Sequence, residues 1–151
     1  MLTRLLSTFF YIGYIPIVPG SVASAVATGM CLLLYENTFA YIVIFVMVTV
    51  IGFIVSGEME QLEGKKDPNC VVIDEVSGIM CAFFMLPATV PVVITTYFLF
   101  RAFDMFKIYP CNRIEMMGGS AGIMLDDIVA GIYTNLVMHL ALYFKLVIGN
   151  Y

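Results

Sequence analysis

"GIMLDDIVAG" (122–131) places two adjacent aspartates, Asp126 and Asp127, inside an apolar run. The surrounding segment, 121–144, has almost the length and composition of a membrane-spanning helix. An ionised side chain deep in a bilayer costs roughly 2.5–3.5 kcal/mol on insertion scales. Two carboxylates at this place therefore indicate a function, and the rest of the chain has to explain them.

The composition of the whole chain is typical of a membrane protein. Of its 151 residues, 62% are hydrophobic and 12% are charged, and the mean hydropathy is +0.99. Soluble domains contain about 25% charged residues. The length suffices for one unit, so we expect a single domain over residues 1–151. Basic patches typical of nucleic-acid-binding proteins are absent from the sequence, and no nucleic-acid partner is expected.

Apolar runs and the breaks between them predict an all-α, polytopic membrane protein with about five membrane-embedded helices. A polar loop is expected at 57–70 and a tight turn at 36–38. The first 18 residues, ended by "PIVPG", are interpreted as an interfacial or re-entrant helix. A cleaved signal peptide is the alternative for this segment, but two prolines interrupt its apolar region. The five predicted helices cover residues 21–35, 39–57, 74–86, 91–108 and 120–146.

Lysine and arginine predict the orientation, because cytoplasmic loops carry an excess of both. With five alternating spans, the N-terminus lies in the cytoplasm and the C-terminus outside. Only Lys145 then falls on the outer side. The basic residues that fall on the cytoplasmic side are Arg4, Lys65, Lys66, Arg101, Lys107 and Arg113.

The same topology brings most of the acidic residues to the cytoplasmic level of the membrane. These seven residues are Glu58, Glu60, Asp74, Glu75, Asp104, Asp126 and Asp127. Arg101 and Lys107 share a helix face with Asp104, because each lies three residues from it. Either some carboxyl groups are protonated or cations neutralise them. Hard divalent ions prefer oxygen ligands, so we expect a Mg²⁺ site here.

Several small residues are expected to make room for this site or to contact its ligand. Gly78 and Gly131 each follow an acid by four residues and leave room for close helix packing beneath it. Gly119 precedes the last helix and can bring backbone N–H groups close to an anion. Next to Gly20, Ser21 is interpreted either as a helix N-cap or as a phosphate contact or nucleophile, and the two interpretations are compatible.

The cysteines and the single histidine are expected to have structural and not catalytic roles. None of the four cysteines has CxxC spacing or an arginine six residues later, so we expect buried thiols and no cysteine phosphatase site. His139 is expected to be a packed or interfacial residue, remote from the acids. The remaining chemistry is metal-assisted and carried by carboxylates.

Four stretches resemble phosphatidylglycerophosphatase A, and they occur in that family's order. They are "PIVPGSVAS" (16–24), "GKKDPNCVVIDEVSG" (64–78), "FRAFDMFKIYP" (100–110) and "GGSAGIMLDDIVAGIY" (118–133). One departure is "GSVAS", where family members often have Gly-Thr, although Ser21 keeps a hydroxyl. The resemblance implies a multi-pass protein of the bacterial inner membrane with its active site at the cytoplasmic face. It implies a Mg²⁺-dependent phosphatase that converts phosphatidylglycerophosphate to phosphatidylglycerol in phospholipid biosynthesis.

The resemblance also carries expected roles for individual residues. Metal ligands would come from Asp74, Glu75, Asp104, Asp126 and Asp127. Substrate contacts would come from Gly20, Ser21, Arg101, Lys107 and Gly119. Catalytic roles fall to Asp127, Glu60, Arg101 and Lys107, with Glu60 or Asp127 as general base or acid. Asp67 also matches an acid of the family.

Two alternatives stay open from the sequence. A membrane ion-binding or transport protein also contains intramembrane carboxylates, although the outer halves of these helices are apolar. A phosphatase for another lipid phosphate, such as phosphatidic acid or a prenyl pyrophosphate, would need similar residues. The sequence leaves three points undecided. They are the number of metal ions (one or two), the mechanism (direct attack by water or a phospho-enzyme) and the oligomeric state.

Overall fold

The computed structural model describes residues 1–148, and every regular element in that range is a helix. The predicted all-α class is therefore confirmed, while residues 149–151 of the predicted domain lie outside the described part. The elements are α1 (Leu2–Ser7), the 3₁₀ helix η1 (Ile12–Tyr14), α2 (Pro19–Leu34), α3 (Thr38–Glu63), α4 (Ile73–Phe83), α5 (Val90–Phe106), α6 (Cys111–Glu115) and α7 (Gly119–Ile148).

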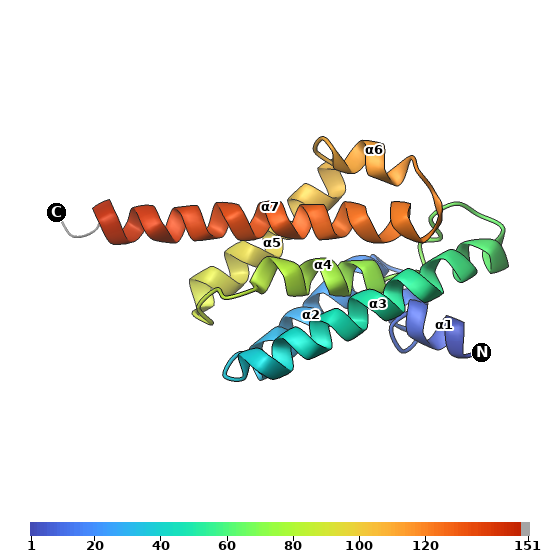
Figure 1. Cartoon of the computed structure of the whole chain (residues 1–151), viewed down its shortest axis with the longest axis horizontal. Coiled ribbons are helices and arrows are strands. Elements are labelled where there is room, and N and C mark those ends of the chain that lie inside the picture. The colour runs from blue at the N-terminus through green and yellow to red at the C-terminus, as the bar shows by residue number, and fades with distance from the viewer. Residues whose placement is uncertain (149–151) are drawn as a thin grey trace.

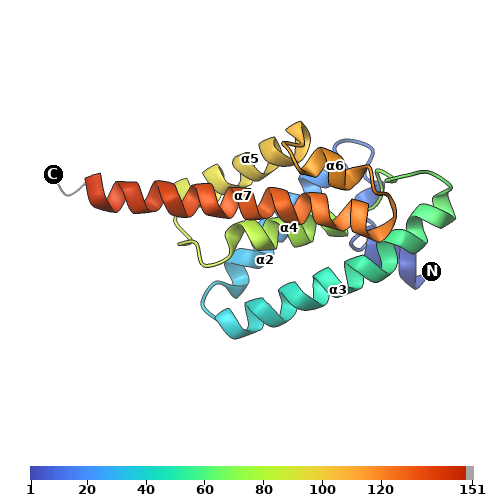
Figure 2. The ribbon, with the colours of Figure 1, turned by 45° about the horizontal axis from the view of Figure 1, so that its top comes forward.

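The short helix α4 lies at the centre of the bundle. Nine of its eleven residues are buried, and it packs against α2, α3, α5 and α7 (Figure 1). Figures 1 and 2 show α3 and α5 ending, and α4 and α7 beginning, toward the same end of the bundle. The predicted gathering of the acid-bearing helix ends at one level is thus present.

Two helices among the described residues are long and apolar enough to cross a membrane. They are α3 and residues Gly119–Lys145 of α7, with mean hydropathies of 2.7 and 1.3 over their most apolar windows. Helix α4 is only about 16 Å long at 1.5 Å per residue, against a hydrocarbon layer of ~30 Å. The five predicted helices are all found, but five full spans are not confirmed, because α2, α4 and α5 are shorter.

Three local features differ from the sequence prediction. Residues 57–63 continue α3 instead of starting a loop, because "EMEQLE" contains good helix formers and the helix ends only at Gly64, whose φ is +62°. The N-terminal segment forms α1 and η1 instead of one helix, because Phe9, Phe10 and Tyr11 take positive φ between them. The five-residue helix α6 was not predicted from the sequence.

Helices α4 and α7 approach each other through two glycines. A Cβ on Gly131 would collide with the backbone oxygen of Gly78. A Cβ on Gly78 would lie 2.7 Å from the backbone oxygen of Asp127 and equally close to the Phe100 ring. The predicted close packing beneath the acids is therefore confirmed, and larger residues would push the two helices apart.

We predict that Gly131→Ala destabilises the protein by about 1–3 kcal/mol, because the added methyl group overpacks the contact with α4. Thermal unfolding of the purified protein in detergent measures the effect. The matched control is Gly29→Ala in α2, where an added Cβ meets no atom within 4 Å. This control should gain about 0.5–1 kcal/mol, since alanine favours a helix over glycine. Equal effects of both variants would contradict the glycine contact.

Candidate active site

A polar cavity of about 230 Å³ lies where the acid-bearing helix ends meet. Its wall comes from the beginnings of α2 and α4, the end of α5, the loop residues Asp67, Asn69 and Val71, and two residues of α7. Six carboxylates and two basic side chains line it. When all are ionised, four negative charges are in excess, so the cavity favours a bound cation.

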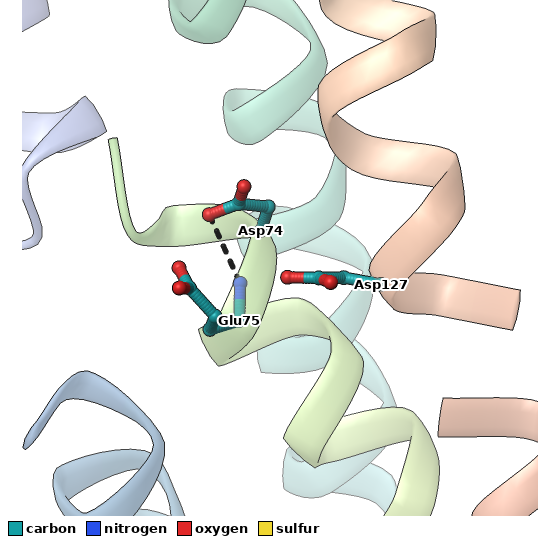
Figure 3. A group of neighbouring side chains, drawn as sticks. All are labelled: Asp74, Glu75 and Asp127. Carbon is teal, nitrogen blue, oxygen red and sulfur yellow. Dashed lines mark hydrogen bonds between the residues drawn. The ribbon is translucent and has the colours of Figure 1, made fainter. Parts of the chain in front are cut away.

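Three of these carboxylates form the innermost group. Asp74 and Glu75 come from the first turn of α4, and Asp127 faces them from α7 (Figure 3). One oxygen from each lies within 4.8 Å of the other two. Asp74 and Asp127 are buried, and the backbone N–H of Glu75 donates to Asp74 Oδ1 at 3.0 Å. The geometry is that of three ligands facing one point.

Two further carboxylates of the cavity, Asp104 of α5 and Asp126 of α7, are paired with basic residues. Arg101 Nη1 lies 2.5 Å from Asp104 Oδ2 and 3.9 Å from Glu75 Oε1. Lys107 Nζ donates to Asp126 Oδ2 at 2.8 Å. Asp104 and Asp126, which the sequence suggested as metal ligands, therefore each hold a cationic side chain at the wall of the cavity.

The donor set of the inner group fits Mg²⁺. This ion takes oxygen ligands at about 2.1 Å in an octahedron, so its ligands lie roughly 3–4 Å from each other. One oxygen from each of Asp74, Glu75 and Asp127 lies within 4.8 Å of the other two, which is close to this range. Glu75 Oε2 is buried and has no hydrogen-bond partner, which leaves an oxygen for a metal ion.

Three cavity positions have a backbone conformation that the sequence did not predict. Val18, Asp67 and Lys107 all have φ between +42° and +47°, and all three line the cavity. Strain of this kind in non-glycine residues clusters at functional sites. Gly20 is needed for a different reason, because a Cβ there would collide with Glu75 Oε1.

Three predicted site residues are not part of this cavity. Glu60 and Gly119 line a second polar cavity of about 430 Å³, together with Lys65 and Lys66. Ser21 does not line the polar cavity either, and its backbone oxygen accepts a hydrogen bond from Tyr97 at 3.0 Å. The N-cap interpretation of Ser21 is wrong, because α2 begins at Pro19 and its N-cap is Val18.

The loop before α4 contributes more than the sequence suggested. "KKDPN" has the composition of a solvated turn, yet Asp67 and Asn69 line the cavity. Asn69 is the uncharged polar side chain of the wall. The match of Asp67 to a family acid was the one indication, and nothing in the sequence singled out Asn69.

Thiol chemistry is not favoured near the site. All four cysteines are free. Burial raises the pKa of the Cys111 thiol, and the nearby Asp126 carboxylate raises it further. Burial also raises the pKa of Cys70. Both thiols therefore stay protonated at neutral pH and are poor nucleophiles. His139 is exposed and lies near the carbonyl of Phe84, at the far end of α4.

Comparison with known proteins gives one family and several relatives. The family model described as phosphatidylglycerophosphatase A matches residues 5–142. A Bacteroides thetaiotaomicron protein named "Putative phosphatidylinositol-3-phosphatase" is 30% identical over 149 residues, covering 91% of each chain. Proteins named phosphatidylglycerophosphatase A are 31% identical in Escherichia coli (85% of this chain, 77% of the relative) and 27% identical in Haemophilus influenzae (95% and 90%). No solved structure matches the chain significantly.

We predict that Gly20→Ala weakens divalent-metal binding by roughly 10-fold, because the added methyl group displaces the Glu75 carboxylate. Titration with Mn²⁺, followed by electron paramagnetic resonance, measures the affinity without any substrate. Gly29→Ala lies on the same helix in open space and serves as the control. Unchanged affinity in Gly20→Ala would show that Glu75 does not contribute to the metal site.

Proposed function

Because the chain belongs to the phosphatidylglycerophosphatase A family, we propose that it hydrolyses phosphatidylglycerophosphate to phosphatidylglycerol and phosphate. It is a phosphoric monoester hydrolase of that family. The observation that carries the proposal is the inner group of Asp74, Glu75 and Asp127, with Arg101 beside it in one cavity. This arrangement suits a phosphate monoester bound at a divalent cation.

The three carboxylates of the inner group would hold Mg²⁺. When bound there, Mg²⁺ supplies charge stabilisation at the phosphoryl oxygens and acidifies a bound water. Arg101 is placed beside Glu75 by its ion pair with Asp104, so its guanidinium presents N–H donors to phosphate oxygens.

Lys107 contributes a second positive charge at the wall of the cavity, where Asp126 holds its amine. The two ion pairs thus keep the cations in place without substrate, as electrostatic preorganisation requires. The leaving glycerol oxygen also needs a proton from an acid near the cavity. Glu60 lines the other cavity, and Asp127 would be ionised as a Mg²⁺ ligand, so this proton would come from an acid outside the three ligands.

The position of the cavity fits a lipid substrate in the membrane. It lies at the end of the bundle where α3 and α5 end, next to the basic residues that the positive-inside rule assigns to the cytoplasm. We therefore place the protein in the bacterial inner membrane as a multi-pass protein, with the cavity at the cytoplasmic headgroup level. The diacylglycerol part then stays in the inner leaflet during the reaction, as phosphatidylglycerol synthesis requires.

A phosphoinositide is the second candidate substrate. The relative named for phosphatidylinositol-3-phosphate hydrolysis matches as much of this chain as the phosphatidylglycerophosphatases do. Both substrates present a phosphate monoester on a headgroup derived from a polyol. The catalytic groups above would serve either one, so only the contacts to the alcohol part distinguish them.

We predict that the purified protein releases phosphate from phosphatidylglycerophosphate only with Mg²⁺, and that Asp127→Asn lowers the rate by at least about 100-fold. The reason is the loss of a carboxylate from the inner group, where metal assistance contributes several kcal/mol. Phosphate release in detergent micelles is the measurement, with phosphatidylinositol 3-phosphate and phosphatidic acid as comparison substrates.

The matched control for this assay is Glu58→Gln. Glu58 is an exposed carboxylate of α3 that accepts a hydrogen bond from Thr3 and does not line the cavity. It should keep wild-type activity. Folded wild-type protein without activity on any of the three lipids would defeat the proposal and make ion transport the next function to test.

We predict that Asp74→Asn and Asp126→Asn fail in different ways. Asp74→Asn should raise the Mg²⁺ concentration needed for half-maximal activity by at least about 10-fold, because it alters a ligand. Asp126→Asn should leave that concentration nearly unchanged and raise KM, because it removes the carboxylate charge that orients Lys107. Rates measured over matrices of Mg²⁺ and lipid concentration separate the two effects. Equal Mg²⁺ dependence in both variants would contradict the division between ligands and ion-pair partners.

A further inference from the structure

The C-terminal end of α4 lies inside the bundle, although every helix leaves its last four carbonyls without intrahelical partners. In a membrane such carbonyls need hydrogen-bond donors from the protein, because hydrocarbon supplies none. Three of the carbonyls at this end have partners close by. The hydroxyl of Tyr41 donates to Met80 O at 2.5 Å, and the backbone N–H groups of residues 84 and 86 donate to Cys81 O and Phe83 O.

Asn135 of α7 supplies the hydrogen-bond donors for two further carbonyls at this end, those of Ala82 and Phe84. Its amide nitrogen, Nδ2, lies 3.0 Å from Ala82 O and 2.7 Å from Phe84 O. The amide carries two hydrogens, so one side chain serves both carbonyls. His139 Nε2, one turn further along α7, also lies 3.3 Å from Phe84 O.

The contacts between α4 and α7 recur at three levels with a spacing of four residues on each helix. At the first level, Asp74 faces Asp127 within the inner carboxylate group. At the second level, Gly78 and Gly131 touch through their backbones. At the third level, Ala82 O accepts the hydrogen bond from Asn135. The glycines have no side chains that could fix the position of one helix along the other. Apart from the acids, the contact in this series that depends on direction is therefore the hydrogen bonding by Asn135.

We propose that Asn135 is a positioning residue, which fixes α4 along its axis against α7 and thereby holds Asp74 and Glu75 at ligand distance from Asp127. The inference rests on the metal-dependent function proposed above. A shift of α4 by one residue moves it about 1.5 Å along its axis, whereas metal–ligand distances tolerate about 0.2 Å. Small axial errors at Asn135 therefore reach the metal site, two turns of α4 away.

The test compares Asn135→Leu with wild-type protein in a Mn²⁺ titration followed by electron paramagnetic resonance. Leucine has the same number of side-chain heavy atoms and the same branching but no donor, so the end of α4 loses its two bonds to Asn135. We expect the Kd for Mn²⁺ to rise at least about 10-fold, as for other supporting residues of metal sites, and kcat to fall. The matched control is Thr134→Val, because the buried Thr134 hydroxyl bonds within α7, to Ala130 O. It should bind Mn²⁺ as wild type does.

Two further variants separate positioning from folding. Asn135→Gln keeps both donors but moves them by one methylene group, so it should bind Mn²⁺ more tightly than Asn135→Leu and more weakly than wild type. If the leucine variant does not fold, Asn135→Ser, with a single short donor, should still show weakened Mn²⁺ binding. Wild-type Mn²⁺ affinity in a folded Asn135→Leu or Asn135→Ser protein would overturn the inference while leaving the proposed function intact. Wild-type protein that binds no Mn²⁺ would overturn the metal-dependent function and this inference together.

Discussion

The contact between Gly78 and Gly131 sets the distance on which the site depends. With no side chains at this point, the backbones of α4 and α7 touch, and the residues one turn earlier on each helix face each other. Those residues are Asp74 and Asp127. Close backbone approach through small residues is a common way for helices to associate in lipid, where no hydrophobic force drives them together. Here the same approach of α4 and α7 also brings the carboxylates of Asp74, Glu75 and Asp127 together. The glycine contact therefore determines both the helix packing and the geometry of the candidate site.

Concentrated negative charge has to be balanced, and the protein balances only part of it. Arg101 and Lys107 each bind the carboxylate that lies at the edge of the group, Asp104 and Asp126. Among the central three carboxylates, Glu75 shares Arg101 through a 3.9 Å contact of its Oε1, and its Oε2 has no hydrogen-bond partner, so the group keeps an excess of negative charge. A fold that leaves such a group uncompensated loses stability without a cation and gains affinity for one. The carboxylates that orient Arg101 and Lys107 from the edge of the group therefore differ from the three at its centre, which are the ones available to a cation.

The sequence predicted the helices and the meeting of their acidic ends, because alternating spans bring every second helix end to the same face. It predicted less well which acids meet. The ion pair between Arg101 and Asp104 is visible as a spacing of three on one helix, whereas Lys107 and Asp126 are joined across α6. Glu60 was misplaced because α3 continues to Glu63, which carries Glu60 beyond the acid group to a cavity beside the beginning of α7. Helix length and rotation, which hydropathy does not determine, decide such placements.

The short length of α4 gives the three inner carboxylates unequal surroundings. Asp74 and Glu75 lie in the first turn of α4, where free backbone N–H groups and the helix dipole favour negative charge. Asp127 lies in the third turn of α7, beyond the reach of that effect, because it falls off within the first turn. A full-length span in place of α4 would begin nearer the membrane surface. Its free N–H groups and the positive end of its dipole would then no longer lie at the same depth in the membrane as Asp127. Of the three, Asp127 therefore gains least from a helix terminus, and the paired aspartates in the apolar run of α7 are tolerated because α4 begins beside them.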